Sequence, residues 1–244
     1  MGKNECNDFK LNYTYNLKNI IIAEDSEELY NNLKNINKLK KFERPDMFLI
    51  KNDIIMGIEA FEFTAYNTNR KGNTVKRKIE ENYKRNEDIF LNNKPNYIYD
   101  EKIIYDKKSI KIYVKNFKKV FDEHYRNVDE YLKNLSQFLP NLQNIKIYFL
   151  IIDTTVEVNE INYENKNIVY NPTMNKEILT FLKDKEKING IIFQCNNLEK
   201  INYYLLELKK NNLDELLKKS EKYVGCELEQ REVKMLNYFG KGVI

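Results

Sequence analysis

The longest apolar run of the chain, IYFLII at residues 147–152, limits the fold more than any other feature of the sequence. A strand that is apolar on both faces belongs in the centre of a sheet, with other structure packed on each side. A second run, IIFQC at residues 191–195, has the same character, and helical patterns occur between and before the two. Strands that alternate with helices predict an α/β fold: a mixed central sheet flanked by helices.

The rest of the chain adds an early hairpin and a helical C-terminal part. Two apolar segments are separated by the turn-forming pair Asn52-Asp53, which predicts a β-hairpin. Apolar residues at helical spacing predict helices that start near Asp25, near Thr74 and at residues 111–139, and again from Leu198 onward. We therefore expect an α/β domain over residues 1–197 and a helical extension, packed on it, over 198–244.

Composition favours a soluble globular protein, because 42% of the residues are hydrophobic and 32% are charged. The N-terminal segment lacks the apolar core of a signal peptide, and no apolar run is long enough to cross a bilayer. The three cysteines form no Cys-x-x-Cys pair, which argues against a disulfide framework or a structural zinc site. We expect a cytoplasmic protein with reduced thiols and no membrane partner.

Positive charge is concentrated in two segments. Residues 70–85 contain seven basic residues against two glutamates, and residues 102–119 contain seven lysines against one aspartate. Because the whole chain carries a net charge of only +4, the remainder is acidic. This distribution is typical of a surface that binds nucleic acid, and we expect DNA in preference to RNA. The alternative is that these lysine-rich helices are simply solvated. The candidate contacts to phosphate are Arg70, Lys71, Lys76, Arg77, Lys78, Lys111 and Lys115.

The apolar hairpin carries two acidic residues, and burying their charges costs free energy unless something compensates them. In a strand, Glu59 shares one face with Phe61 and Phe63, and Asp46 begins the partner strand. Two carboxylates brought together repel each other unless a cation lies between them. Mg²⁺, or Mn²⁺, suits such a pair because it binds through one or two carboxylates and keeps several waters. The alternative is structural: a turn-capping aspartate and a glutamate paired with a lysine.

These residues resemble the motif of the PD-(D/E)XK nuclease superfamily, the restriction-endonuclease-like proteins. Pro45-Asp46 and Glu59-Ala60-Phe61 occupy the places of its Pro-Asp and Glu-x-Lys elements, and the likeness extends over about residues 25–153. The resemblance implies a core of helix, three-stranded meander, helix and strand, and a divalent metal that activates water against a phosphodiester. It makes Asp46 and Glu59 the metal ligands. Glu28, on the helix predicted to start near Asp25, is the candidate for an additional acid, and Glu24 and Glu27 are alternatives for that place.

One departure bears on activity. Phe61 stands where the family has lysine, so another cation has to take that role, and Lys71 or Lys76, just beyond the strand, are the candidates. Without such a replacement the chain is an inactive nucleic-acid-binding protein on the same fold. A third reading is a protein-interaction module, since the leucine-rich C-terminal helices allow a homodimer. His124, the only histidine, fits a hydrogen-bonded, partly buried residue better than a catalytic base, because no nucleophile motif accompanies it.

Overall fold

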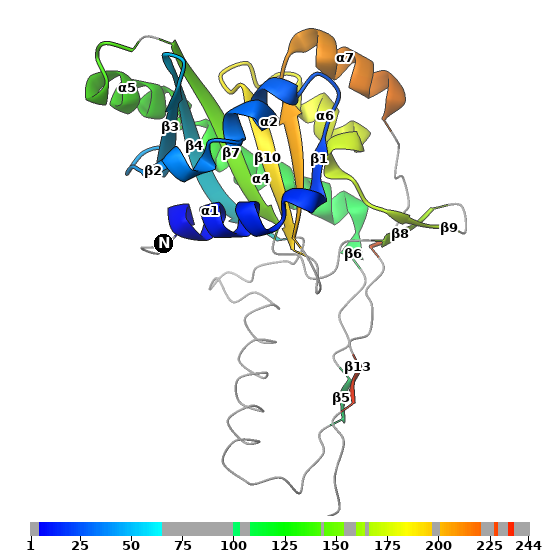
Figure 1. Ribbon diagram of the computed structural model, residues 1–244. Helices are drawn as coiled ribbons and strands as arrows, with labels where there is room; N and C mark the ends of the chain where they lie inside the picture. Colours follow the sequence, from blue (N-terminus) through cyan, green and yellow to red (C-terminus); the bar gives the residue numbers. More distant parts are fainter. Residues whose placement is uncertain are drawn as a thin grey trace, which may run out of the picture.

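A computed structural model describes residues 5–64, 100–102, 108–142, 144–153, 160–163, 166–196, 201–220, 227–228 and 234–236. Its centre is a seven-stranded sheet with the strand order β1-β11-β10-β7-β4-β3-β2 (Figure 1). The strands are β1 (Ile20–Ile22), β2 (Lys40–Lys41), β3 (Met47–Lys51), β4 (Ile54–Phe63), β7 (Asn144–Asp153), β10 (Gly190–Asn196) and β11 (Ile201–Glu207).

The sheet is mixed, which confirms the predicted α/β class. β4, β7 and β10 lie parallel to one another. β2, β3 and β4 form an antiparallel meander, β11 is antiparallel to β10, and β1 is parallel to β11. As predicted, β7 is central: it pairs with β4 over ten residues and with β10 over six.

Helices cover both faces of this sheet and make two separate cores (Figure 1). One face is covered by α4 (Ile110–Tyr125), α5 (Val128–Phe138), α6 (Lys176–Leu182) and α7 (Lys210–Lys219). The other face is covered by α1 (Glu5–Tyr15) and α2 (Glu27–Leu33). Shorter elements are η1 (Leu17–Asn19), η2 (Ile36–Lys38), η3 (Pro172–Met174), β5 (Asp100–Lys102), β6 (Lys108–Ser109), β8 (Glu160–Tyr163), β9 (Lys166–Val169), β12 (Glu227–Leu228) and β13 (Lys234–Leu236).

The β3–β4 hairpin forms as predicted. Asn52 and Asp53 both adopt positive φ angles, 48° and 60°, which the tight turns of two-residue hairpins require and which Asn and Asp tolerate better than most residues. The predicted alternation along β4 is also confirmed. Phe61 and Phe63 pack in the core beneath α4 and α5, whereas Ile58 and Ala60 pack in the core beneath α1 and α2.

Helix α5 approaches β4 closely at Gly57. A Cβ atom on this glycine would lie 2.6 Å from Cδ1 of Leu135 and 3.0 Å from Cδ1 of Ile147 and Cγ of Pro45. These separations are too short for a side chain without some shift of its neighbours. The absence of a side chain at Gly57 thus lets α5 lie directly on the strand that carries Glu59.

Two predicted helices differ in extent from those observed. The helix expected over residues 111–139 is divided into α4 and α5, which are separated by Arg126 and Asn127. The helix predicted to start near Asp25 is α2, which ends at Leu33; its N-cap residue is Ser26, and Asp25 before it has a φ of 57°. The break places His124 and Tyr131 on two separate helices.

The prediction of helix from Leu198 onward is wrong for residues 201–207, which form β11. β11 lies inside the sheet between β1 and β10, so the chain after residue 197 completes the sheet instead of packing on it as a helical extension. Its Leu205 and Leu206 are buried in the two opposite cores, and Leu213 and Leu216 of α7 are buried as well. These leucines therefore find their packing partners within the chain.

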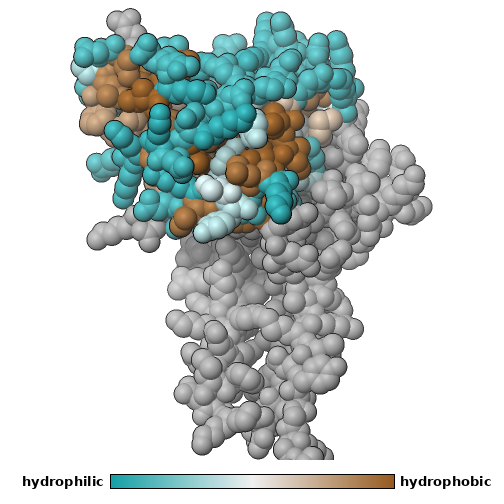
Figure 2. All heavy atoms as spheres, in the orientation of Figure 1, coloured by the Kyte–Doolittle hydropathy of each residue, from teal (hydrophilic) through white to brown (hydrophobic). Residues whose placement is uncertain are grey.

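The surface on the side drawn in Figure 2 is mainly hydrophilic, with separate apolar patches. Among the described residues, large exposed apolar side chains gather on α1, η1 and β1, where Leu11, Tyr15, Leu17, Ile21 and Ile22 lie, and Phe138 at the end of α5 is also exposed. No helix in the described part of the chain is long and apolar enough to span a membrane.

Candidate functional site

Asp46 and Glu59 are neighbours across the hairpin. The register pairs Met47 of β3 with Ile58 of β4, so Asp46, one residue earlier, stands opposite Glu59, one residue later. The carboxylate of Asp46 accepts a hydrogen bond from the backbone N–H of Ala60, with a distance of 2.7 Å between N and Oδ2. Folding of the hairpin alone therefore brings the two predicted acids together.

Glu59 is 8% exposed, and side chains of α4 and α5 hold its carboxylate. The hydroxyl of Tyr131 donates to Oε1 at 2.8 Å, and Nδ1 of His124 lies 2.9 Å from the same oxygen. Because a carboxylate oxygen only accepts hydrogen bonds, the second contact places a proton on Nδ1. Each hydrogen bond to a charged group contributes about 1.5–3 kcal/mol, enough to offset much of the cost of burying Glu59.

Burial keeps Tyr131 in its protonated, donating form. Desolvation raises the pKa of the Tyr131 phenol well above its ordinary value, and the negative charge of Glu59 raises the pKa further. The hydroxyl therefore remains a hydrogen-bond donor to Glu59 throughout the physiological pH range.

Phe61, which stands in the place of the motif lysine, is a core residue. It is 1% exposed, and its ring stacks on the imidazole of His124 with centroids 4.2 Å apart and an interplanar angle of 13°. It also forms T-shaped ring pairs with Phe121 and Phe149. The described structure thus places an aromatic pair, Phe61 with His124, beside Glu59.

Arg44 lies at the entrance to the hairpin, two residues before Asp46. Its guanidinium donates to both carboxylate oxygens of Glu130 at 3.0 and 3.2 Å, and Glu130 is the neighbour of Tyr131 in α5. Both side chains of this ion pair are largely exposed, so its contribution to stability is small. Its effect is to tie the start of the hairpin to the helix that supplies Tyr131.

The donor set at Asp46 and Glu59 fits a hard cation with few protein ligands. Among the described residues, the side-chain hydrogen bonds to Glu59, from Tyr131 and His124, both fall on Oε1, which leaves Oε2 for a ligand. Among the described residues, no group of three or more His, Cys, Asp or Glu side chains could hold a metal. Two carboxylates suit Mg²⁺, which keeps several of its waters, better than zinc, which usually takes three or four protein ligands.

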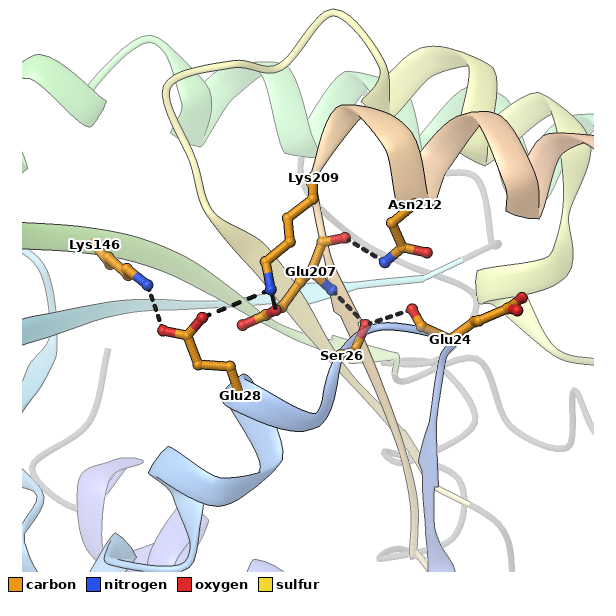
Figure 3. A network of polar contacts seen from close by, with 7 residues as sticks. All are labelled: Glu24, Ser26, Glu28, Lys146, Glu207, Lys209 and Asn212. Atoms are coloured by element: carbon orange, nitrogen blue, oxygen red, sulfur yellow. Dashed lines mark hydrogen bonds and ion pairs between the residues drawn. The ribbon is translucent and has the colours of Figure 1, made fainter.

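Glu28, the third predicted ligand, is not brought to Asp46 and Glu59. It lies on α2, over the opposite face of the sheet, where it accepts from Lys146 Nζ at 2.5 Å and lies 3.6 Å from Lys209 Nζ (Figure 3). The hydrogen bond with Lys146 lowers the pKa of Glu28. Glu28 thus belongs to an ion-pair network on the other face of the sheet, and α2 does not bring it close to Asp46 and Glu59.

The same network includes a buried acid, Glu207, at the end of β11. Glu207 is 2% exposed, and its Oε2 lies 2.6 Å from Lys209 Nζ (Figure 3). The backbone N–H of Glu207 donates to Ser26 Oγ, and Asn212 of α7 donates to the Glu207 carbonyl. These contacts join α2 and α7 to the sheet. An open pocket of about 480 Å³ beside them is lined by Asp25, Glu27, Glu28, Lys209, Lys210, Asn211 and Asn212.

The predicted phosphate contacts are only partly within the described structure. Lys111 and Lys115 are exposed on α4, whose opposite side is buried in the core. The other candidates, including both replacements proposed for the motif lysine, lie outside the described residues: Arg70, Lys71, Lys76, Arg77 and Lys78.

Comparisons with known proteins give no match: no family model, curated protein or solved structure corresponds to this chain.

Two residues of the site were not predicted as such: Tyr131 and His124. His124 was expected to be partly buried and hydrogen-bonded, but its partner was not predicted, because Tyr131 and His124 reach Glu59 from 72 and 65 residues away in the sequence. No local pattern in the sequence links either side chain to Glu59.

Proposed function

We propose that this protein is a metal-dependent nuclease in which Asp46 and Glu59 hold Mg²⁺ or Mn²⁺. The observation that carries the proposal is that Asp46 and Glu59 stand opposite each other across the β3–β4 hairpin. The order of elements adds support. Helix α2, the meander β2-β3-β4, helices α4 and α5, and the parallel strand β7 follow the order that the PD-(D/E)XK resemblance implies.

The chain's own residues have distinct roles in this proposal. Asp46 and Glu59 bind the ion, which when bound neutralises phosphate charge and activates water. Lys111 and Lys115, on the exposed side of α4, contact the phosphates of a nucleic acid, DNA in preference to RNA. Lys71 or Lys76 supplies the positive charge of the motif lysine, whose place is taken by Phe61.

A cleavage assay on single- and double-stranded DNA and RNA, with Mg²⁺, Mn²⁺ or EDTA, tests the proposal. We expect metal-dependent cutting by the wild type and its loss in Asp46→Asn and Glu59→Gln. Glu62→Gln is the matched control, since Glu62 is an exposed acid on the same strand and on the opposite face. Cutting that survives both site substitutions, or that continues in EDTA, would refute the assignment.

A second candidate function rests on Phe61. Because this position is filled by a buried ring stacked on His124, the chain also fits a nucleic-acid-binding protein without turnover. Such a protein would bind nucleic acid with the same dependence on salt, would cut no substrate with any metal, and would keep its affinity in Asp46→Asn. The same set of variants therefore decides between the two functions.

A further inference from the structure

Within the described part of the chain, both hydrogen bonds to the Glu59 carboxylate fall on the same oxygen. Oε1 takes the hydrogen bond from Tyr131 at 2.8 Å and the contact with His124 at 2.9 Å. Since a carboxylate oxygen has about two lone-pair sites, these two donors use the acceptor capacity of Oε1. The ligand that Glu59 offers to an ion is then Oε2 alone.

The two groups that hold Oε1 are themselves fixed by packing. Tyr131 is 2% exposed in the first turn of α5, and its backbone N–H donates to Asn127 at 3.1 Å. The ring of His124 lies flat on Phe61, which is buried against Phe121 and Phe149. Rotation of the Glu59 carboxylate would break both contacts at once, so the described structure holds it in a single orientation.

We propose that Tyr131 and His124 are positioning residues that set the ion selectivity of this site, an inference that rests on the proposed function. A carboxylate confined to one ligand oxygen suits Mg²⁺ or Mn²⁺, which take six ligands in near-octahedral geometry. Ca²⁺ takes six to eight oxygens and often binds both oxygens of one carboxylate. By occupying Oε1, the two residues deny Ca²⁺ this bidentate contact and favour the smaller ions.

Ion binding by the full chain tests this role without reference to turnover. Dissociation constants for Mn²⁺ and Ca²⁺ are measured by calorimetric titration for the wild type, Tyr131→Phe and His124→Phe. Each substitution keeps an aromatic ring and removes one hydrogen bond to Glu59. We expect the wild type to bind Mn²⁺ more tightly than Ca²⁺. In each variant, the ratio of the Ca²⁺ dissociation constant to the Mn²⁺ dissociation constant should fall about tenfold, the effect typical of removing a hydrogen bond to a metal ligand.

Tyr203→Phe is the control, because Tyr203 is buried and its hydroxyl donates to Gln194 away from the site. An unchanged Mn²⁺-to-Ca²⁺ ratio in a folded Tyr131→Phe or His124→Phe, or an equal change in Tyr203→Phe, overturns the selectivity role. The proposed metal site would still stand after such a result, provided that the wild type binds ions and Asp46→Asn does not. If the wild type binds neither ion, the metal site and the selectivity role both fail.

Discussion

Two strand glycines, Gly57 and Gly190, allow a quantitative test of how tightly the central sheet is packed. A Cβ atom at Gly190 would lie 2.6 Å from the backbone carbonyl oxygen of Leu206, within the β10–β11 ladder. The Cβ at Gly57 would meet a side-chain methyl of Leu135 at the same distance. A methyl group can turn away, whereas a ladder carbonyl cannot move without loss of pairing. Gly190→Ala should therefore be the more destabilising substitution.

The expected sizes follow from these contacts. Overpacking costs about 1–3 kcal/mol, and the clash with a backbone carbonyl places Gly190 at the upper end of this range. After the gain of about 0.5–1 kcal/mol from replacing a strand glycine, Gly190→Ala should cost about 2 kcal/mol. At Gly57 the clash is partly relieved and is offset by the gain of about 0.5–1 kcal/mol from replacing a strand glycine, so the net loss should be below about 1 kcal/mol. For a chain of this length each 1 kcal/mol lowers Tm by about 2–4 °C, which predicts a fall of about 4–8 °C for Gly190→Ala.

Thermal unfolding followed by circular dichroism measures both variants. A loss at Gly57→Ala equal to or larger than that at Gly190→Ala would contradict the reasoning. A larger residue at Gly57 extends the test to the site, because it would displace Leu135, which lies one helical turn from Tyr131. Gly57→Val should therefore weaken ion binding as well as stability.

Three further outcomes are expected. Asp53→Gly should raise the free energy of unfolding by on the order of 0.5 kcal/mol in urea titrations, because it relieves a left-handed φ of 60°. The hydrogen bond with Lys146 lowers the pKa of Glu28, so its contribution to stability is present at neutral pH and declines as the pH falls below the ordinary value of 4.5. Glu28→Gln should therefore lower the urea midpoint at pH 7, and its difference from the wild type should shrink as the pH is lowered below 4.5. Replacing Lys111 and Lys115 together by alanine should reduce the slope of log affinity against log salt by about 2 in fluorescence-anisotropy titrations with DNA; an unchanged slope would remove α4 from the interface.

The hairpin and the central strand could be predicted because their signals are local. Asn52-Asp53 lies between two apolar segments, and strict alternation fixed which face of β4 carries Glu59. The facing position of Asp46 and Glu59 follows from the same register. These parts of the fold need no knowledge of distant residues.

Strand β11 could not be recognised by the same means. Its residues are apolar on both faces, and the leucines that follow in α7 continue the pattern, so periodicity alone does not separate a buried strand from a helix here. Pairing with β10 and β1 decides the outcome, and that pairing depends on the rest of the sheet.

The residues around Glu59 depend on the same kind of long-range placement. Tyr131 reaches the carboxylate because the chain breaks between α4 and α5 and because Gly57 admits α5 onto β4. Neither effect has a sequence pattern that names Glu59 as the partner. Glu28 shows the converse. Its place on a helix before the hairpin agreed with the resemblance, but that helix, α2, covers the other face of the sheet, where Glu28 pairs with Lys146.

The most direct test of metal-dependent hydrolysis by Asp46 and Glu59 is DNA cleavage in ¹⁸O-labelled water, with Mg²⁺ and with EDTA, by the wild type and Glu59→Gln. We expect label in the newly formed phosphate ends of the wild-type reaction with Mg²⁺, and no product in EDTA or with Glu59→Gln. Absence of cleavage by the wild type, or labelled product that persists in Glu59→Gln, would contradict the nuclease assignment.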